Sequence, residues 1–171
     1  MPDLSTELTF KPLLNSRRPE FFSWLFFFVM LGVVILYPGA GLGRIGGYLL
    51  AGFFLFSGLV LSLANWQNRK TALTLSAAGV RFENGLQNIW MPWGEVSQIE
   101  VFSGRVNDKI RVKSADQYFA FDMYNEVVVN GKSRGAVGFE QGETILETIF
   151  EHAQIDKTQM YHADGYDYYT R

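Results

Sequence analysis

Cysteine is absent from this sequence of 171 residues, and histidine occurs only twice, as His152 and His162. Without a thiol the chain can form no disulfide, no thiolate nucleophile and no cysteine-ligated metal site. His152 has Glu151 and Asp156 near it, but this setting favours an exposed histidine at a helix end over a metal ligand. No pattern of nucleophile, base and carboxylate suggests catalysis. We therefore expect no catalytic residue, no metal and no cofactor, and we do not expect an enzyme.

Charged residues are absent from two long stretches, residues 21–43 and 45–68, which only Arg44 separates. A helix needs roughly 20 apolar residues to cross about 30 Å of hydrocarbon. We predict two transmembrane helices, residues 21–37 and 45–66, in a tight hairpin. The alternative is a signal peptide followed by a buried core helix. We favour the hairpin because the first run is longer than a signal core of about 7–15 residues and the second is apolar all round.

Basic and aromatic residues suggest how this hairpin is oriented. In the first 70 residues only Arg44 lies on the turn side, and the other basic residues lie on the opposite side. The positive-inside rule then places both termini in the cytoplasm. Trp24 and Trp66 flank one end of the hairpin and Tyr37 and Tyr48 the other, as expected of aromatic belts at the two interfaces. The basic residues on the tryptophan side are Lys11, Arg17, Arg18, Arg69 and Lys70.

Small residues recur every four positions, at Gly39, Gly43, Gly47 and Ala51. On a helix they form a stripe that permits close approach of a second helix. The stripe suits either a dimer contact or packing of the two helices within one chain, and we favour packing within the chain.

The charge balance excludes one class of partner. Residues 71–171 hold nine basic and fourteen acidic residues, a net charge of −5, whereas residues 1–70 hold six and three, a net charge of +3. Binding to nucleic acid depends on neutralising phosphates, so we expect no nucleic-acid partner. The sequence GLGRIG at residues 41–46 matches a dinucleotide motif by letter, but it lacks the second strand and the acidic residue that such a site needs.

From residue 71 the apolar pattern alternates with period two, which predicts antiparallel strands. Six short strands fit residues 71–123, with a tight turn at Asn84 and Gly85. Residues 126–129 and 136–139 either supply a seventh strand to the sheet or pair with each other in a small hairpin. After Gly142 the pattern becomes that of an amphipathic helix, and the tyrosine-rich residues 155–171 are expected to form a mobile tail.

Two segments sharpen this picture: ALTLSAAGVRF at residues 72–82 and IWMPWGEVSQIEV at residues 89–101. Together they resemble the opening of bacterial pleckstrin-homology-like (PH-like) domains, which occur in small membrane proteins with two preceding helices. The resemblance covers residues 21 to about 150, and the long segment 124–142 departs from it. It implies a membrane helical hairpin plus an all-β PH-like domain, with about seven antiparallel strands in a barrel or sandwich capped by one C-terminal helix.

The resemblance also implies a domain plan and a location. Residues 1–20 would form a cytoplasmic segment, 21–68 the transmembrane hairpin, 71–154 the PH-like domain and 155–171 the tail. The chain would be a multi-pass protein of a bacterial cytoplasmic (inner) membrane. It would also be a possible homo-oligomer, because domains of this kind are thought to self-associate.

Lys109, Arg111 and Lys113 project from one face of a predicted strand, with Arg105 just before them. They suit a contact with anionic lipid or an acidic partner, or else a solvated face paired across the sheet with Glu100, Asp116 or Asp122. The loop at residues 76–79 is uncharged, so the resemblance carries no phosphoinositide binding to this chain, and we expect this loop to approach the membrane instead.

These observations lead to one expected function and one alternative. We expect a non-enzymatic, membrane-tethered module that presents a protein- or peptide-binding surface at the cytoplasmic face, with the lipid bilayer and an unidentified protein as partners. A strand edge, the groove beside the C-terminal helix and the basic stripe all suit that role. The alternative is an anionic-lipid-binding or envelope-maintenance protein.

Overall fold

The computed structural model describes residues 7–37, 43–104, 108–129 and 132–171. The chain divides into two compact units. We call Ser16–Gln67 the hairpin unit, and Met1–Asn15 together with Asn68–Arg171 the β unit.

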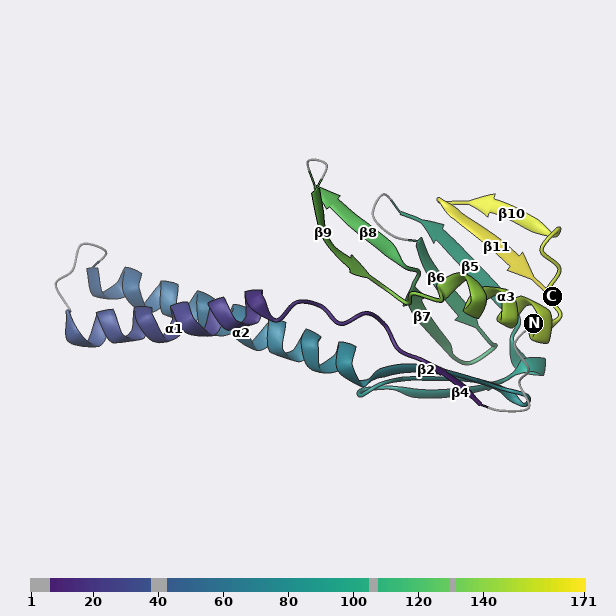
Figure 1. The fold of residues 1–171 in the computed structure, drawn as a ribbon, viewed down its shortest axis with the longest axis horizontal. Coiled ribbons are helices and arrows are strands. Elements are labelled where there is room, and N and C mark those ends of the chain that lie inside the picture. The colour runs from purple at the N-terminus through teal and green to yellow at the C-terminus, as the bar shows by residue number, and fades with distance from the viewer. Residues whose placement is uncertain (1–6, 38–42, 105–107, 130–131) are drawn as a thin grey trace. The chain divides into compact units, whose positions relative to one another are not determined.

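The hairpin unit contains α1 (Arg18–Leu36) and all but the last three residues of α2 (Gly43–Lys70), two antiparallel helices that lie side by side (Figure 1). Both are long and apolar enough to cross a membrane. Helix α1 begins three residues earlier than predicted, because a proline in its first turn needs no intrahelical hydrogen bond there. Helix α2 runs on to Lys70, where basic side chains favour the negative end of the helix dipole.

The first sheet of the β unit has four antiparallel strands in the order β1-β2-β3-β4. Strand β1 comes from the N-terminal segment, for which we predicted no structure. Leu8 and Phe10 of this strand pack against the core, and the Thr9 and Thr74 hydroxyl groups lie 3.1 Å apart. Three alternating residues are too short a pattern to identify a strand by sequence. The strands are β1 (Leu8–Phe10), β2 (Thr71–Ser76), β3 (Gly79–Asn84) and β4 (Asn88–Pro92).

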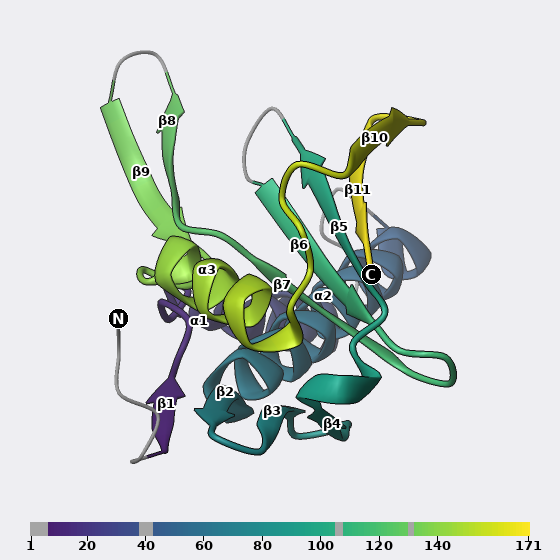
Figure 2. The ribbon, with the colours of Figure 1, turned by 90° about the vertical axis from the view of Figure 1, so that its right-hand side faces the viewer.

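The second sheet has five antiparallel strands in the order β10-β11-β5-β6-β7, and Figure 2 shows β11 beside β5. A short 3₁₀ turn, η1 (Trp93–Glu95), leads into it from β4. Residues 155–171, predicted as a tail, instead supply β10 and β11. Asp164 and Gly165 take positive φ angles of 52° and 79° in the two-residue turn between these strands. The strands are β5 (Gln98–Ser103), β6 (Asp108–Lys113), β7 (Tyr118–Asp122), β10 (Met160–Ala163) and β11 (Tyr166–Thr170).

Strands β8 (Asn125–Val129) and β9 (Lys132–Val137) pair only with each other in the described structure (Figure 2). This confirms the small hairpin over a seventh strand added to the sheet. The described residues therefore contain eleven strands instead of about seven, in two sheets and one hairpin. They form no closed barrel.

One apolar core joins the two sheets and the predicted helix α3 (Gly142–Ala153). The rings of Phe82 and Phe119 stack across the sheets with centroids 5.3 Å apart. Phe150 of α3 meets Tyr169 of β11 edge to face at 4.9 Å, so a tyrosine of the expected tail packs against the core. The largest fully buried side chains include Leu73, Leu75, Met91, Ile99, Ile110, Phe119, Ile145 and Ile149.

Candidate functional site

The five-stranded sheet turns one face to the core and the other away from it. Ile99, Ile110 and Phe121 point into the core, so the residues that alternate with them lie on the opposite, outer face. Register pairs align residues of all five strands there, for example Tyr168 with Glu100 and Glu100 with Arg111. The outer face carries Glu100 and Phe102, Lys109, Arg111 and Lys113, Tyr118 and Asp122, Tyr166 and Tyr168, and Tyr161.

Glu100 lies at the centre of this face, yet only 2% of it is exposed. The Arg111 Nη1 donates a hydrogen bond to one carboxylate oxygen at 2.9 Å, and the Lys113 ammonium group pairs with the other. A buried carboxylate requires such partners, because a charge removed from water without compensation is strongly destabilising. Of the three cations of the predicted stripe that the structure describes, two are therefore held by one carboxylate.

Aromatic rings surround the Arg111–Glu100 pair. The Arg111 guanidinium carbon lies 5.6 Å from the ring centroid of Tyr118 and 5.9 Å from that of Tyr166, within the range of cation–π attraction. Tyr168 stacks on Tyr161 with centroids 4.8 Å apart. Partial burial, followed by the negative charge of Glu100, raises the pKa of Tyr168 above its ordinary value of 10.0. The outer face is thus a packed layer of aromatic and charged groups.

The predicted basic stripe is only partly brought together. Lys109, Arg111 and Lys113 do share one face, but Arg105 lies outside the described residues. Lys109 is exposed and lies opposite Asp122 in register. Sequence analysis named Glu100 as one possible partner but missed its burial. It also missed the tyrosines of β11, although an Asp-Gly pair between alternating residues 160–163 and 166–170 signals a hairpin.

The hairpin unit is packed along a seam of small residues on α2. A side chain at Gly47 would lie 2.3 Å from a methyl group of Val34, and Ala51 is buried. Gly58 continues this seam, where a side chain would meet the Trp24 ring at 3.2 Å. Within one chain, the seam therefore lets α1 and α2 approach closely. Of the four predicted stripe residues, Gly39 lies outside the described part, and Gly43 is the first residue of α2.

A cluster of polar groups joins the two helices near the start of α1. Glu20 is 8% exposed and accepts hydrogen bonds from Ser62 and Asn65 of α2, each at 2.8 Å. The Arg17 guanidinium also donates to this carboxylate, with Nε at 3.0 Å. Our predicted first span began after Glu20, so it contained no ionisable residue; helix α1 includes this one. An open pocket of about 390 Å³ beside the cluster is lined by Arg17, Glu20, Phe21 and Trp24.

The four residues predicted as interface belts differ in their surroundings. Trp24 is half-buried, and its indole Nε1 donates to Ser62 at 3.0 Å inside the hairpin. Tyr37, Tyr48 and Trp66 are exposed. Trp24 therefore contributes to the helix contact, whereas the other three project from the hairpin.

Neither histidine stands in a metal-binding group within the described part of the chain, where no three potential ligands converge. The ring of His152 packs on Trp93 with centroids 5.3 Å apart, and its Nδ1 lies 3.0 Å from the Thr148 carbonyl oxygen. His162 lies 2.8 Å from Asp167 on β11. These contacts suit roles in packing and in strand pairing.

Comparisons of the chain with protein-family models, with curated proteins and with solved structures find no match. The outer face of the five-stranded sheet and the hairpin are therefore the features that bear on function.

Proposed function

We propose that this chain is a non-enzymatic, membrane-tethered module of PH-like type that binds a protein through the outer face of its five-stranded sheet. The hairpin is the tether, and the β unit is held at the cytoplasmic side of a bacterial inner membrane. One observation carries the proposal: the outer face gathers tyrosines and an arginine around a buried ion pair. Tyrosine and arginine are enriched at the centres of protein interfaces, where their rings and planar groups supply contact area.

The tether is supported by the surface of the hairpin. Within residues 21–37 and 45–66, the large side chains that the two helices expose are apolar or aromatic, including Phe22, Phe28, Leu49, Phe53 and Phe56. Soluble proteins rarely expose contiguous apolar surface of this kind, but lipid solvates it. Pairing of β1 with β2 also places the chain before α1 and the chain after α2 in one folded unit. The two helices together then cross the bilayer an even number of times.

Protein is favoured over anionic lipid as the partner of the outer face. Anionic lipid would require free cations, but Arg111 and Lys113 are both paired with Glu100. Among the described residues, Lys109 is the cation at the rim of the face, and its neighbours in register are Phe102 and Asp122. A surface of this composition fits aromatic and carboxylate side chains of a protein better than a row of phosphates.

The proposal is tested by photo-crosslinking in membranes of the native host. A photoreactive amino acid replaces Tyr118, which is exposed on the outer face, or Glu147, which is exposed on α3. We expect a discrete adduct from position 118 alone, which weakens when Lys109→Glu reverses the rim charge. An adduct of twice 19.4 kDa would identify a second copy of the chain as the partner.

Two results would contradict this function. One is the same adducts from positions 118 and 147, or none from either. The other is lipid binding through the outer face: anionic vesicles would then compete for the face, and Lys109→Glu would weaken vesicle binding by the whole chain in a salt-dependent manner.

A further inference from the structure

The turn between β3 and β4 lies beside the end of helix α2. The chain leaves α2 at Lys70 and enters β2 at Thr71, and Thr71 pairs with Asn84, the last residue of β3. The turn formed by residues 84–87 therefore stands at the helix end of the first sheet. The turn at residues 76–79, which we expected to approach the membrane, lies at the other end of β2, about 20 Å away at 3.3 Å per residue.

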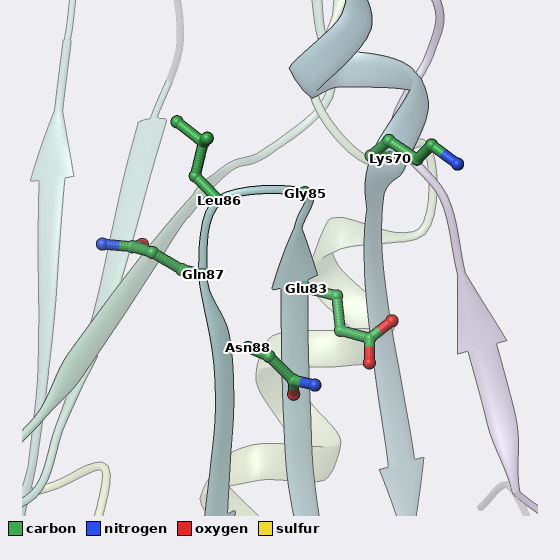
Figure 3. Close-up of a pocket in the computed structure, with 6 residues that line it drawn as sticks. All are labelled: Lys70, Glu83, Gly85, Leu86, Gln87 and Asn88. Atoms are coloured by element: carbon green, nitrogen blue, oxygen red, sulfur yellow. The ribbon is translucent and has the colours of Figure 1, made fainter.

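This β3–β4 turn is held in one shape by its own hydrogen bonds. The Asn84 side-chain oxygen accepts from the backbone N–H groups of Leu86 and Gln87, at 3.1 and 2.8 Å. Gly85 takes a φ of 80°, which favours glycine. Leu86 is thereby presented outward and is 64% exposed. Figure 3 shows its side chain projecting from the turn, away from the strands, at the end where the helix joins.

Polar groups surround the same place. Lys70, Glu83, Gln87 and Asn88 line an open pocket of about 300 Å³ together with the turn (Figure 3). Arg69 and Lys70 form the basic last turn of α2, four residues or about 6 Å of helix rise beyond Trp66. A cationic helix end next to one projecting leucine has the composition of a membrane-interface contact, where basic groups bind phosphates and apolar side chains enter the acyl boundary.

We propose that the β3–β4 turn is a second membrane contact of the β unit. Leu86 enters the headgroup region of the bilayer that holds the hairpin, and Lys70 binds a phospholipid phosphate beside it. This inference rests on the proposed tether, and it adds to that proposal a fixed orientation of the β unit. A β unit held at both the helix end and the turn presents its outer face in one direction and cannot rotate freely about a single link.

The absence of cysteine makes a clean test possible, because a single introduced cysteine can be labelled alone. The whole chain is reconstituted in phosphatidylcholine–phosphatidylglycerol vesicles that contain nitroxide-labelled lipids. A fluorophore is placed at Leu86→Cys, at Ala77→Cys in the distant turn, or at Phe56→Cys near the middle of α2. We expect strong quenching at positions 56 and 86, and several-fold weaker quenching at position 77.

The outcomes separate this inference from the tether. Quenching at position 56 with no difference between positions 86 and 77 would overturn the turn contact and leave the tether standing. No quenching at position 56 would overturn both. As a second variant, Leu86→Asp with the label at Gln87→Cys should abolish the quenching at position 87, whereas Ala77→Asp should leave it unchanged; equal quenching in both variants would also overturn the turn contact.

Discussion

Within residues 21–37 and 45–66 of the hairpin unit, the large side chains that face outward are apolar or aromatic, whereas in the β unit apolar side chains face inward and form a core. Among the residues whose burial is described, each unit buries one carboxylate, and the two carboxylates have different partners. Glu20 lies between helices among Arg17, Ser62 and Asn65, whereas Glu100 lies on the outside of a sheet beneath Arg111 and Lys113.

This contrast fits the proposed tether, in which hydrocarbon surrounds the hairpin unit and water surrounds the β unit. In hydrocarbon, apolar burial gives no drive for helices to associate, so close packing and polar contacts must hold the pair together. In water, burial of apolar surface drives the sheets together, so a polar group on the outer face is not needed to hold them together. The buried Glu20 is therefore explained by the hairpin itself, whereas the buried Glu100 organises a surface that the fold does not require.

The largest expected effect comes from replacing one phenylalanine by alanine in each unit. Phe119→Ala removes a ring that is 1% exposed and should destabilise the β unit by about 3–5 kcal/mol. Phe56→Ala removes a ring that is 68% exposed on α2 and should leave the β unit unchanged. Hydrogen exchange of the whole chain in detergent micelles, resolved by peptide, measures both. Equal loss of protection in β5–β7 in the two variants would contradict the contrast between apolar side chains that face outward in the hairpin unit and inward in the β unit.

A smaller effect is expected at the polar cluster of the hairpin. Glu20→Ala leaves the donors of Arg17, Ser62 and Asn65 without their shared acceptor, so the open fraction of the hairpin should rise several-fold. Spin labels on cysteines at the exposed positions Phe22 and Leu63 report this as a broader distance distribution. Glu20→Gln keeps one acceptor oxygen and should broaden the distribution less. A distribution unchanged in Glu20→Ala would show that the small-residue seam alone holds the helices.

The sequence predicted those elements whose apolar pattern is long and regular. Both helices of the hairpin, helix α3 and the six strands between residues 71 and 123 are confirmed. The predicted start of α1 is three residues too late, because the uncharged run begins only after Glu20. That residue belongs to the helix because Arg17 balances its charge and Ser62 and Asn65 of α2 donate hydrogen bonds to it, and no local pattern can reveal the donors on α2.

The site was only half predictable for a similar reason. The alternation of Lys109, Arg111 and Lys113 identified the strand face that carries them. Burial of Glu100 depends on which strands flank β5, and one of them, β11, is sixty-odd positions further along the chain. Tyr166 and Tyr168 were assigned to a tail because their strand is short and mostly aromatic, and its place in the sheet is a long-range pairing.

The smallest expected effect is that of the Glu100 charge on the pKa of Tyr168. Partial burial and then the Glu100 charge raise the pKa of Tyr168 above 10.0, so Glu100→Gln should lower that pKa while the effect of burial remains. With its folded-state pKa raised, Tyr168 contributes stability that is fully present below pH 10.0 and is lost as the pH rises through the folded-state pKa, because the unfolded chain releases the proton first. In Glu100→Gln that alkaline loss should be smaller.

The phenolate absorbance of each protein, minus that of the same protein with Tyr168→Phe, gives the titration, and Glu147→Gln on α3 is the matched control. A Tyr168 pKa that stays the same or rises in Glu100→Gln would mean that Glu100 does not act on the tyrosine layer, and the outer face would then lack the electrostatic centre on which its proposed role depends.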